Sequence, residues 1–323
     1  MSWKNLGAVS VVALIGLLSA VVPEPVAQAQ TGRTVKLIVP YPPASGPDIL
    51  ARLMGEQIGR TQRVTMVIEN RPGGATVIGT EAAARAAPDG NMVLLVANSF
   101  VSNPAFKPQK YDVTRSFDPV CYLASTPMVL VVQASSPFKT LEDLLAAARA
   151  KPGELSYGTS PNSSLFVAFE VLKRATNVNM TFVPFPGNAP AVNMLVGGHL
   201  TSVIADYPAV VSHLKSGTLR ALVTASGKRI PTLPEVPTFK EAGIKYEVDI
   251  FYGVVGPAKT PPDKLKQLQE WFSAALRAPD IQPRLAAQGL FPVGICGTPF
   301  GDYMRQLVEE YTRIVQEAGL KSN

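Results

Sequence analysis

Two short loops, rich in proline and small polar residues, contain the side chains best suited to bind a ligand. Each loop follows an apolar run and leads directly into a helix-like segment, so backbone N–H groups and the positive end of a helix dipole would face an approaching anion. The candidate binding residues of the first loop are Tyr41, Pro43, Ala44, Ser45 and Asp48. Those of the second loop are Thr159, Ser160, Asn162, Ser163 and Ser164. If the two loops face each other, they predict a clamp for a carboxylate.

Capping of helices is the structural alternative for several of these residues. Ser45 is placed as an N-cap with Asp48 three residues on, and capping is favoured for Asp48 because a carboxylate repels an anionic ligand. The second loop has five small polar residues in the six positions 159–164, which is more than a cap requires. Asp206 follows an expected strand, 200–205, and either caps the next helix or lines the cleft.

Motifs for catalysis and cofactor binding are missing from the sequence. The loop 69–75 (ENRPGGA) lacks the Gly-Lys-Ser/Thr ending of a nucleotide-binding loop, and no Gly-x-Ser-x-Gly elbow occurs. Ser160 and Ser163 would therefore be nucleophiles without an evident activating base. The chain has two histidines and two cysteines with no short-spaced pair among them, so we expect neither a metal site nor a cofactor.

The two cysteines, Cys121 and Cys296, lie far apart in the sequence and in apolar surroundings. A disulfide is one possibility in an oxidising compartment, and two separate buried thiols are the other.

The N-terminal segment 1–29 is typical of an export signal. Lys4 is its one cation before the uncharged run 6–22, and the residues ending at Ala29 have the small-x-small form of a cleavage site. We expect cleavage near Ala29 and a mature chain in the periplasm. An uncleaved membrane anchor is the alternative, because the apolar run is close to spanning length.

Composition excludes several classes of protein. Of the 323 residues, 46% are hydrophobic and 17% charged, which suits about two domains with large buried cores. The formal net charge is +6, but Lys and Arg are dispersed without interleaved aromatics. We therefore expect no nucleic-acid partner, whereas small anions stay plausible ligands.

Strand-like and helix-like segments alternate along the chain, as in parallel sheets with crossover helices. One series covers 35–97, a second covers 141–224, and an apolar run at 251–256 returns toward the first. The pattern predicts an α/β protein of two lobes joined by crossing segments. Ligand sites in such folds lie at the carboxyl ends of strands, in the cleft between lobes.

Ordered motifs over essentially the whole mature chain resemble those of the extracytoplasmic receptors of tripartite tricarboxylate transporters, the Bug family. The matching segments are 39–42 (VPYP), 48–52 (DILAR), 69–73 (ENRPG), 84–90 (ARAAPDG), 188–191 (NAPA), 197–198 (GG), 219–222 (LRAL) and 234–238 (PEVPT). The resemblance implies a two-lobed periplasmic-binding-protein fold, type II-like, which closes as a Venus flytrap. The expected boundaries are 30–125 with 252–323 for lobe 1, and 126–251 for lobe 2.

The resemblance also implies a monomeric receptor that delivers a di- or tricarboxylate, or an aromatic carboxylate, to membrane permease subunits. Backbone amides and hydroxyls of the two loops would hold the carboxylate. Ala44 and Ser45 stand where the family has a double glycine, and apolar Phe185 and Pro186 stand where a lysine is usual, which favours an apolar ligand body. Two other functions stay open: ligand presentation to a membrane sensor kinase, and an exported serine hydrolase.

Overall fold

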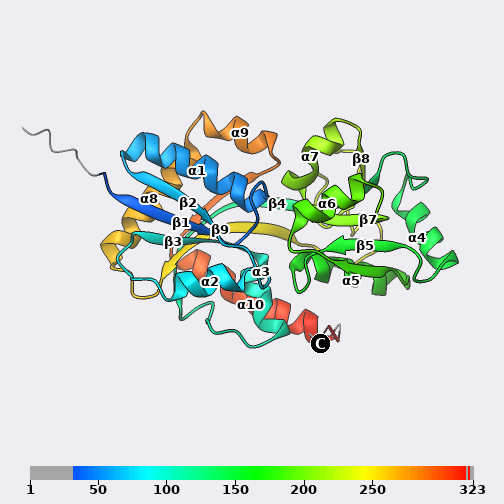
Figure 1. Ribbon diagram of the computed structural model, residues 1–323, viewed down its shortest axis with the longest axis horizontal. Coiled ribbons are helices and arrows are strands. Elements are labelled where there is room, and N and C mark those ends of the chain that lie inside the picture. Colours follow the sequence, from blue (N-terminus) through cyan, green and yellow to red (C-terminus); the bar gives the residue numbers. More distant parts are fainter. Residues whose placement is uncertain (1–31, 318, 321–323) are drawn as a thin grey trace, which may run out of the picture. The chain divides into compact units, whose positions relative to one another are not determined.

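The structure of the protein is a computed structural model, which describes residues 32–317, 319 and 320. The predicted signal peptide and its cleavage site therefore lie outside the described residues. Within the part that is described, no helix is both long and apolar enough to cross a membrane. The described chain is an α/β protein of two lobes, as the sequence predicts (Figure 1).

The first lobe is built around three parallel strands in the order β2-β1-β3. Their apolar side chains, such as Leu37 and Leu95, are fully buried between helices, so burial rather than propensity holds them in the sheet. The elements of this lobe are β1 (Thr34–Val39), α1 (Gly46–Gln62), β2 (Thr65–Asn70), α2 (Val77–Ala84), β3 (Met92–Ala97), α3 (Asn98–Phe106), α8 (Pro262–Arg277), α9 (Ile281–Ala287), β10 (Phe291–Cys296) and α10 (Thr298–Glu317).

The second lobe repeats this design with the parallel strands β6-β5-β7. Its first helix begins at a full capping box, in which the side chains of Thr140 and Asp143 each accept a hydrogen bond from the other residue's backbone N–H. The elements are α4 (Leu141–Ala150), β5 (Ser156–Thr159), α5 (Ser164–Thr176), β6 (Thr181–Pro184), α6 (Asn188–Val196), β7 (Ser202–Asp206), α7 (Tyr207–Lys215) and β8 (Leu219–Thr224).

Two long antiparallel strands, β4 (Phe117–Gln133) and β9 (Asp249–Pro257), connect the lobes. β4 pairs with β9 and β10 over its first part and with β7 and β8 over its second, so one strand belongs to both sheets (Figure 1). β4 contains two apolar runs, 119–125 and 128–133, and Pro127 between them pairs with Asp249. The expected lobe boundaries fall inside β4 and β9 and stay a prediction.

Of the two alternatives for the cysteines, the structure shows the disulfide, which joins β4 and β10. Cys121 lies opposite Cys296 in the antiparallel pair, and the two form a disulfide across 175 residues of sequence. This bond ties the C-terminal part of the first lobe to the start of β4.

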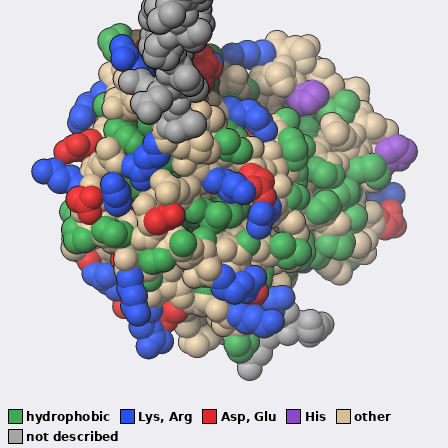
Figure 2. Space-filling view, turned by 60° about the vertical axis from the view of Figure 1, so that its left-hand side comes forward, with side chains coloured by type: hydrophobic (Ala, Val, Ile, Leu, Met, Phe, Trp, Pro, Cys, Tyr) green, Lys and Arg blue, Asp and Glu red, His purple; other side chains and the backbone are tan. Residues whose placement is uncertain are grey.

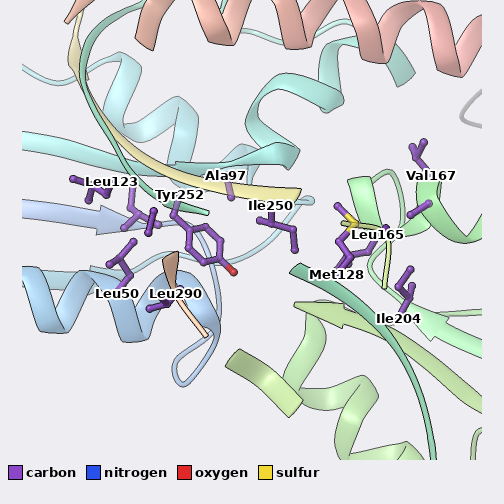
Figure 3. Close-up of a cluster of buried hydrophobic side chains, with 14 of the residues drawn as sticks. Leu50, Ala97, Leu123, Met128, Leu165, Val167, Ile204, Ile250, Tyr252 and Leu290 are labelled. Atoms are coloured by element: carbon purple, nitrogen blue, oxygen red, sulfur yellow. The ribbon is translucent and has the colours of Figure 1, made fainter. Parts of the chain in front are cut away.

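Apolar packing continues from one lobe into the other along β9. Figure 3 shows Ile250 and Tyr252 on this strand, with Leu50 and Leu290 on one side and Met128, Leu165 and Ile204 on the other. On the face shown in Figure 2, Lys and Arg side chains are interspersed with Asp and Glu, as the dispersed charges of the sequence suggest.

Candidate functional site

A cavity of about 80 Å³ lies between the two lobes, where strands of both sheets end and helices begin. Six of the predicted site residues line it: Tyr41, Ser45, Ser160, Ser163, Ser164 and Asp206. The other lining residues are Pro40, Pro42, Pro47, Gly73, Ala75, Thr76, Ala97, Asn98, Ser99, Pro161, Leu165, Pro186, Gly187, Asn188, Ile250 and Tyr252. The two predicted loops therefore face each other across one cavity.

Helix N-termini surround this cavity. The residues at the N-cap positions of α1, α2, α3, α5, α6 and α7 are all among its lining residues, namely Ser45, Thr76, Ala97, Ser163, Gly187 and Asp206. Each helix start contributes N–H groups without an intrahelical acceptor and roughly half a positive charge. Together they make a positive environment out of backbone alone.

The first loop is held in shape by Asp48, which is not among the residues that line the cavity. Its buried carboxylate accepts hydrogen bonds from the backbone N–H of Ala44 (2.9 Å), Asn70 Nδ2 (2.8 Å) and Arg52 Nε (3.0 Å). Burial opposes ionisation, but these hydrogen bonds outweigh it and hold the pKa of Asp48 below its usual value. Asp48 therefore has a structural role, but it orders the loop through the N–H of Ala44 and does not cap α1 in the way that the sequence suggested.

Ser45 does not cap α1 as the sequence suggested, and Ala44 beside it takes a left-handed backbone conformation. Ala44 has φ of +62°, the left-handed conformation that glycine adopts at little cost. The loop therefore has the backbone conformation that favours glycine, although alanine occupies the position. The Ser45 side chain makes no capping hydrogen bond and donates instead to the carbonyl of Pro42 (2.7 Å). The first N–H groups of α1 are thus not capped by Ser45. Pro43 and Ala44 lie outside the lining residues.

The second loop divides into capping and lining residues. Ser163 caps α5 by accepting from the N–H of Phe166 (3.2 Å) and donates to the carbonyl of Ser160 (2.7 Å). Asn162 takes a left-handed φ of +57° and, like Thr159, lies outside the lining residues. The buried Thr159 hydroxyl has no hydrogen-bond partner among the described residues.

Among the described residues that line the cavity, Asp206 is the one acidic side chain. It stands at the N-cap position of α7 but makes no capping hydrogen bond, so the capping alternative is wrong. Its carboxylate accepts from Tyr252 Oη and Asn188 Nδ2, yet burial still raises its pKa above the usual value. A Cβ at Gly46 would overlap both Asp206 and Tyr252, so only glycine allows α1 to approach them this closely.

A protein-family model matches most of the chain. The family model described as "Tripartite tricarboxylate transporter family receptor" (TctC) matches residues 50–320. The chain belongs to this family of receptors.

Solved structures of similar proteins cover nearly the whole chain. The periplasmic binding protein BugD is 28% identical, with 90% of this chain and 99% of that chain aligned and a TM-score of 0.86. A protein from R. palustris with adipate is 29% identical over 89% of this chain and 97% of its own, at a TM-score of 0.85. MatC from Rhodopseudomonas palustris, with bound malate, is 26% identical over 88% and 99%, at 0.82. The family resemblance and the fold predicted from the sequence are both confirmed.

Sequence reasoning missed the contribution of β3 and α3 to the site of this receptor. Asn98 and Ser99 start α3 directly after β3, with no loop of small residues between the two elements to mark the site. Ser99 bonds with the hydroxyl of Tyr41 (2.6 Å). The hydrophobic pattern of 91–97 indicated the strand, and the polar pair Asn98 and Ser99 directly after it was a signal that could have indicated the helix start.

The lining residues of this receptor restrict its chemistry. They include hydroxyls, amides and backbone N–H groups, but neither a histidine nor a Lys or Arg side chain. Across the described ranges, no cluster of three or more His, Cys, Asp or Glu side chains is arranged to hold a metal ion. The donors that an anion could meet in the cavity are therefore neutral, and the lining carboxylate of Asp206 is already paired with Tyr252 and Asn188.

Proposed function

We propose that this receptor captures one small carboxylate in the periplasm and releases it unchanged to the permease subunits of a tripartite transporter. The observation that carries the proposal is the convergence of six helix N-termini on one cavity whose lining has no Lys or Arg. Neutral donors at helix starts are a common site for carboxylates and phosphates. The adipate and malate in the two relatives from Rhodopseudomonas support the choice of a carboxylate.

The rest of the lining suits a hydrocarbon body. The apolar part of the lining consists of Tyr41, Leu165, Ile250 and several prolines. One of these prolines, Pro186, stands in the position where the resemblance led us to expect a lysine. Because the described lining residues include no cation, a second carboxylate would also depend on hydroxyls and backbone N–H groups. We therefore expect ligands with a carboxylate at one end and an apolar or aromatic body, with aliphatic dicarboxylates as the next choice.

Calorimetry on the mature chain, 30–323, tests this ligand class. We would titrate benzoate, adipate and malate, and expect saturable binding of at least one of them at one site per chain. Chromatography after prolonged incubation should recover the ligand unchanged. Absence of binding for all carboxylates, or turnover of an ester analogue that Ser160→Ala removes, would contradict the proposal, the latter in favour of the hydrolase.

Export and delivery need separate measurements. Mass spectrometry of the protein from the periplasm should give a mature chain beginning near Gln30, as the cleavage motif predicts. Deleting the receptor's gene should abolish uptake of the carboxylate that calorimetry identifies, and the gene supplied in trans should restore it. Normal uptake with loss of a transcriptional response to the ligand would instead support the sensor-kinase role.

A further inference from the structure

The loop between β2 and α2 lines the cavity in an unusual backbone conformation. Four consecutive residues have positive φ: Gly73 (+123°), Gly74 (+56°), Ala75 (+52°) and Thr76 (+79°). Alanine and the β-branched threonine adopt such angles only against strain. Gly73, Ala75 and Thr76 are all among the lining residues. A strained segment persists only where the surrounding structure holds it, so the loop needs a contact that fixes its shape.

Asn103 on α3 supplies such a contact. Its Nδ2 donates a hydrogen bond to the carbonyl of Ala75 (2.7 Å) and a longer one to Thr76 Oγ1 (3.4 Å). Asn103 is only 3% exposed, and its side chain also hydrogen-bonds with the Tyr111 hydroxyl. Burial and this additional partner restrict the orientation of the amide. The two residues of the loop that are not glycine are therefore both tied to one fixed side chain.

The loop has backbone donors that a ligand could use. The N–H groups of Ala75 and Thr76 have no hydrogen-bond acceptor among the described residues, whereas those of the next two residues donate back to carbonyls of the loop. An N–H without an internal acceptor beside a cavity can donate to a carboxylate, directly or through a bridging water. The direction of both N–H groups depends on the left-handed backbone of the loop. A change of φ at Ala75 would redirect them.

We propose that Asn103 is a positioning residue of the carboxylate site: it holds residues 73–76 in the conformation that presents their N–H groups to the ligand. Asn103 does not line the cavity, so it acts through the loop rather than by contact with the ligand. This inference rests on the proposed receptor function. It also gives a role to the loop 69–75, which lacks the ending of a nucleotide-binding loop.

Calorimetry on the mature chain with adipate, malate and benzoate tests the effect on binding. Asn103→Ala should weaken the tightest of the three about five- to tenfold, which corresponds to the loss of one hydrogen bond. Gln109→Ala is the matched control, because the Gln109 amide donates to the carbonyls of Asn103 and Lys107 and makes no hydrogen bond to the loop. It should bind as the unmodified chain does.

Ala75→Gly separates positioning of the loop from general damage to the fold. Glycine adopts the left-handed conformation without strain, so adding Ala75→Gly to Asn103→Ala should bring the affinity back to within about threefold of the unmodified chain. Ala75→Gly alone should change the affinity by less than about twofold, since Asn103 already holds the loop. A loss caused by a damaged fold would persist in the double variant.

Backbone NMR chemical shifts of Ala75 and Thr76, measured without ligand, provide a readout that does not depend on binding. They should indicate the left-handed conformation in the unmodified chain and in the double variant, and its loss in Asn103→Ala. The inference is overturned if Asn103→Ala leaves the shifts or the affinity unchanged, if Gln109→Ala weakens binding equally, or if Ala75→Gly restores none of the loss. If the unmodified chain binds none of the three carboxylates, the proposed function fails, and the shifts alone decide whether Asn103 sets the shape of the loop.

Discussion

Tyr252 on β9 donates a hydrogen bond to the carboxylate of Asp206 at the start of α7. This hydrogen bond connects a crossing strand with the second lobe inside the cavity. Both side chains are almost fully buried, and Asn188 supplies the second side-chain donor to the carboxylate. Close contact with Gly46 brings the first lobe to the same point. The cavity is thus organised around one buried carboxylate whose hydrogen bonds come from neutral groups.

Tyr252→Phe should destabilise the protein because it leaves the buried Asp206 carboxylate with one donor fewer. The expected loss is about 1–3 kcal/mol in the free energy of unfolding. Urea denaturation at neutral pH measures it. Tyr207→Phe is the control, since its hydroxyl bonds to the exposed Thr232 and its loss should cost less. Equal losses in the two variants would contradict the importance of the Asp206 contact.

Gly46→Ala should weaken carboxylate binding strongly. The added methyl group would overlap Asp206 Oδ2 and Tyr252 Oη, so α1 must move away from the second lobe and its N–H groups with it. Calorimetry with the best carboxylate measures the effect. Gly59→Ala, in the same helix but away from the cavity, should leave affinity unchanged and test for general effects of replacing glycine by alanine in α1.

The pKa of Asp48 predicts a pH dependence of stability. Its folded-state pKa lies below the usual 3.8, so the folded protein is stabilised above that value and loses the contribution as the pH falls through the folded-state pKa. Asp48→Asn should therefore destabilise the protein at neutral pH, and the difference should shrink below about pH 4. Denaturation curves over a pH series measure this. A difference that stays constant with pH would show that the charge of Asp48 contributes nothing.

Salt should affect carboxylate binding only slightly. The lining residues that the structure describes include no Lys or Arg, so little of the attraction comes from exposed ion pairs that salt screens. We expect the dissociation constant to change by less than about threefold between low and high ionic strength. A steep dependence would mean that a side-chain cation outside the lining residues holds the ligand.

Loss of the disulfide should lower stability without removing binding. Cys121→Ser with Cys296→Ser removes a cross-link that closes 175 residues of chain, which typically costs about 2–5 kcal/mol. Both positions lie outside the cavity lining. Thermal unfolding with and without reductant should show a lower melting temperature for the reduced chain and no effect of reductant on the double variant.

Hydrophobic periodicity and loop composition gave most of the elements and the two loops of the site, because both signals are local. The run 35–40 followed by small residues indicated β1 and the start of α1, and 155–164 indicated β5 and the start of α5 in the same way. Ser45 and Ser160 could therefore be assigned to one candidate site before any tertiary contact was known, and both line the same cavity. A local pattern cannot show which other helix N-termini lie beside these loops, because that depends on contacts between residues far apart in the chain.

The sequence by itself determined the α/β class, the two lobes and the presence of anion-suited loops, since each depends on residues close together in the chain. Tertiary structure decided the pairing of Cys121 with Cys296, the position of Asn98 at the cavity and the contact of Asp206 with Tyr252. The two contacts join residues that are 46 and 175 positions apart in sequence. The position of Asn98 depends on which elements pack around the cavity. Their physical origin is the packing of whole sheets and helices, which brings distant residues together only after the chain has folded.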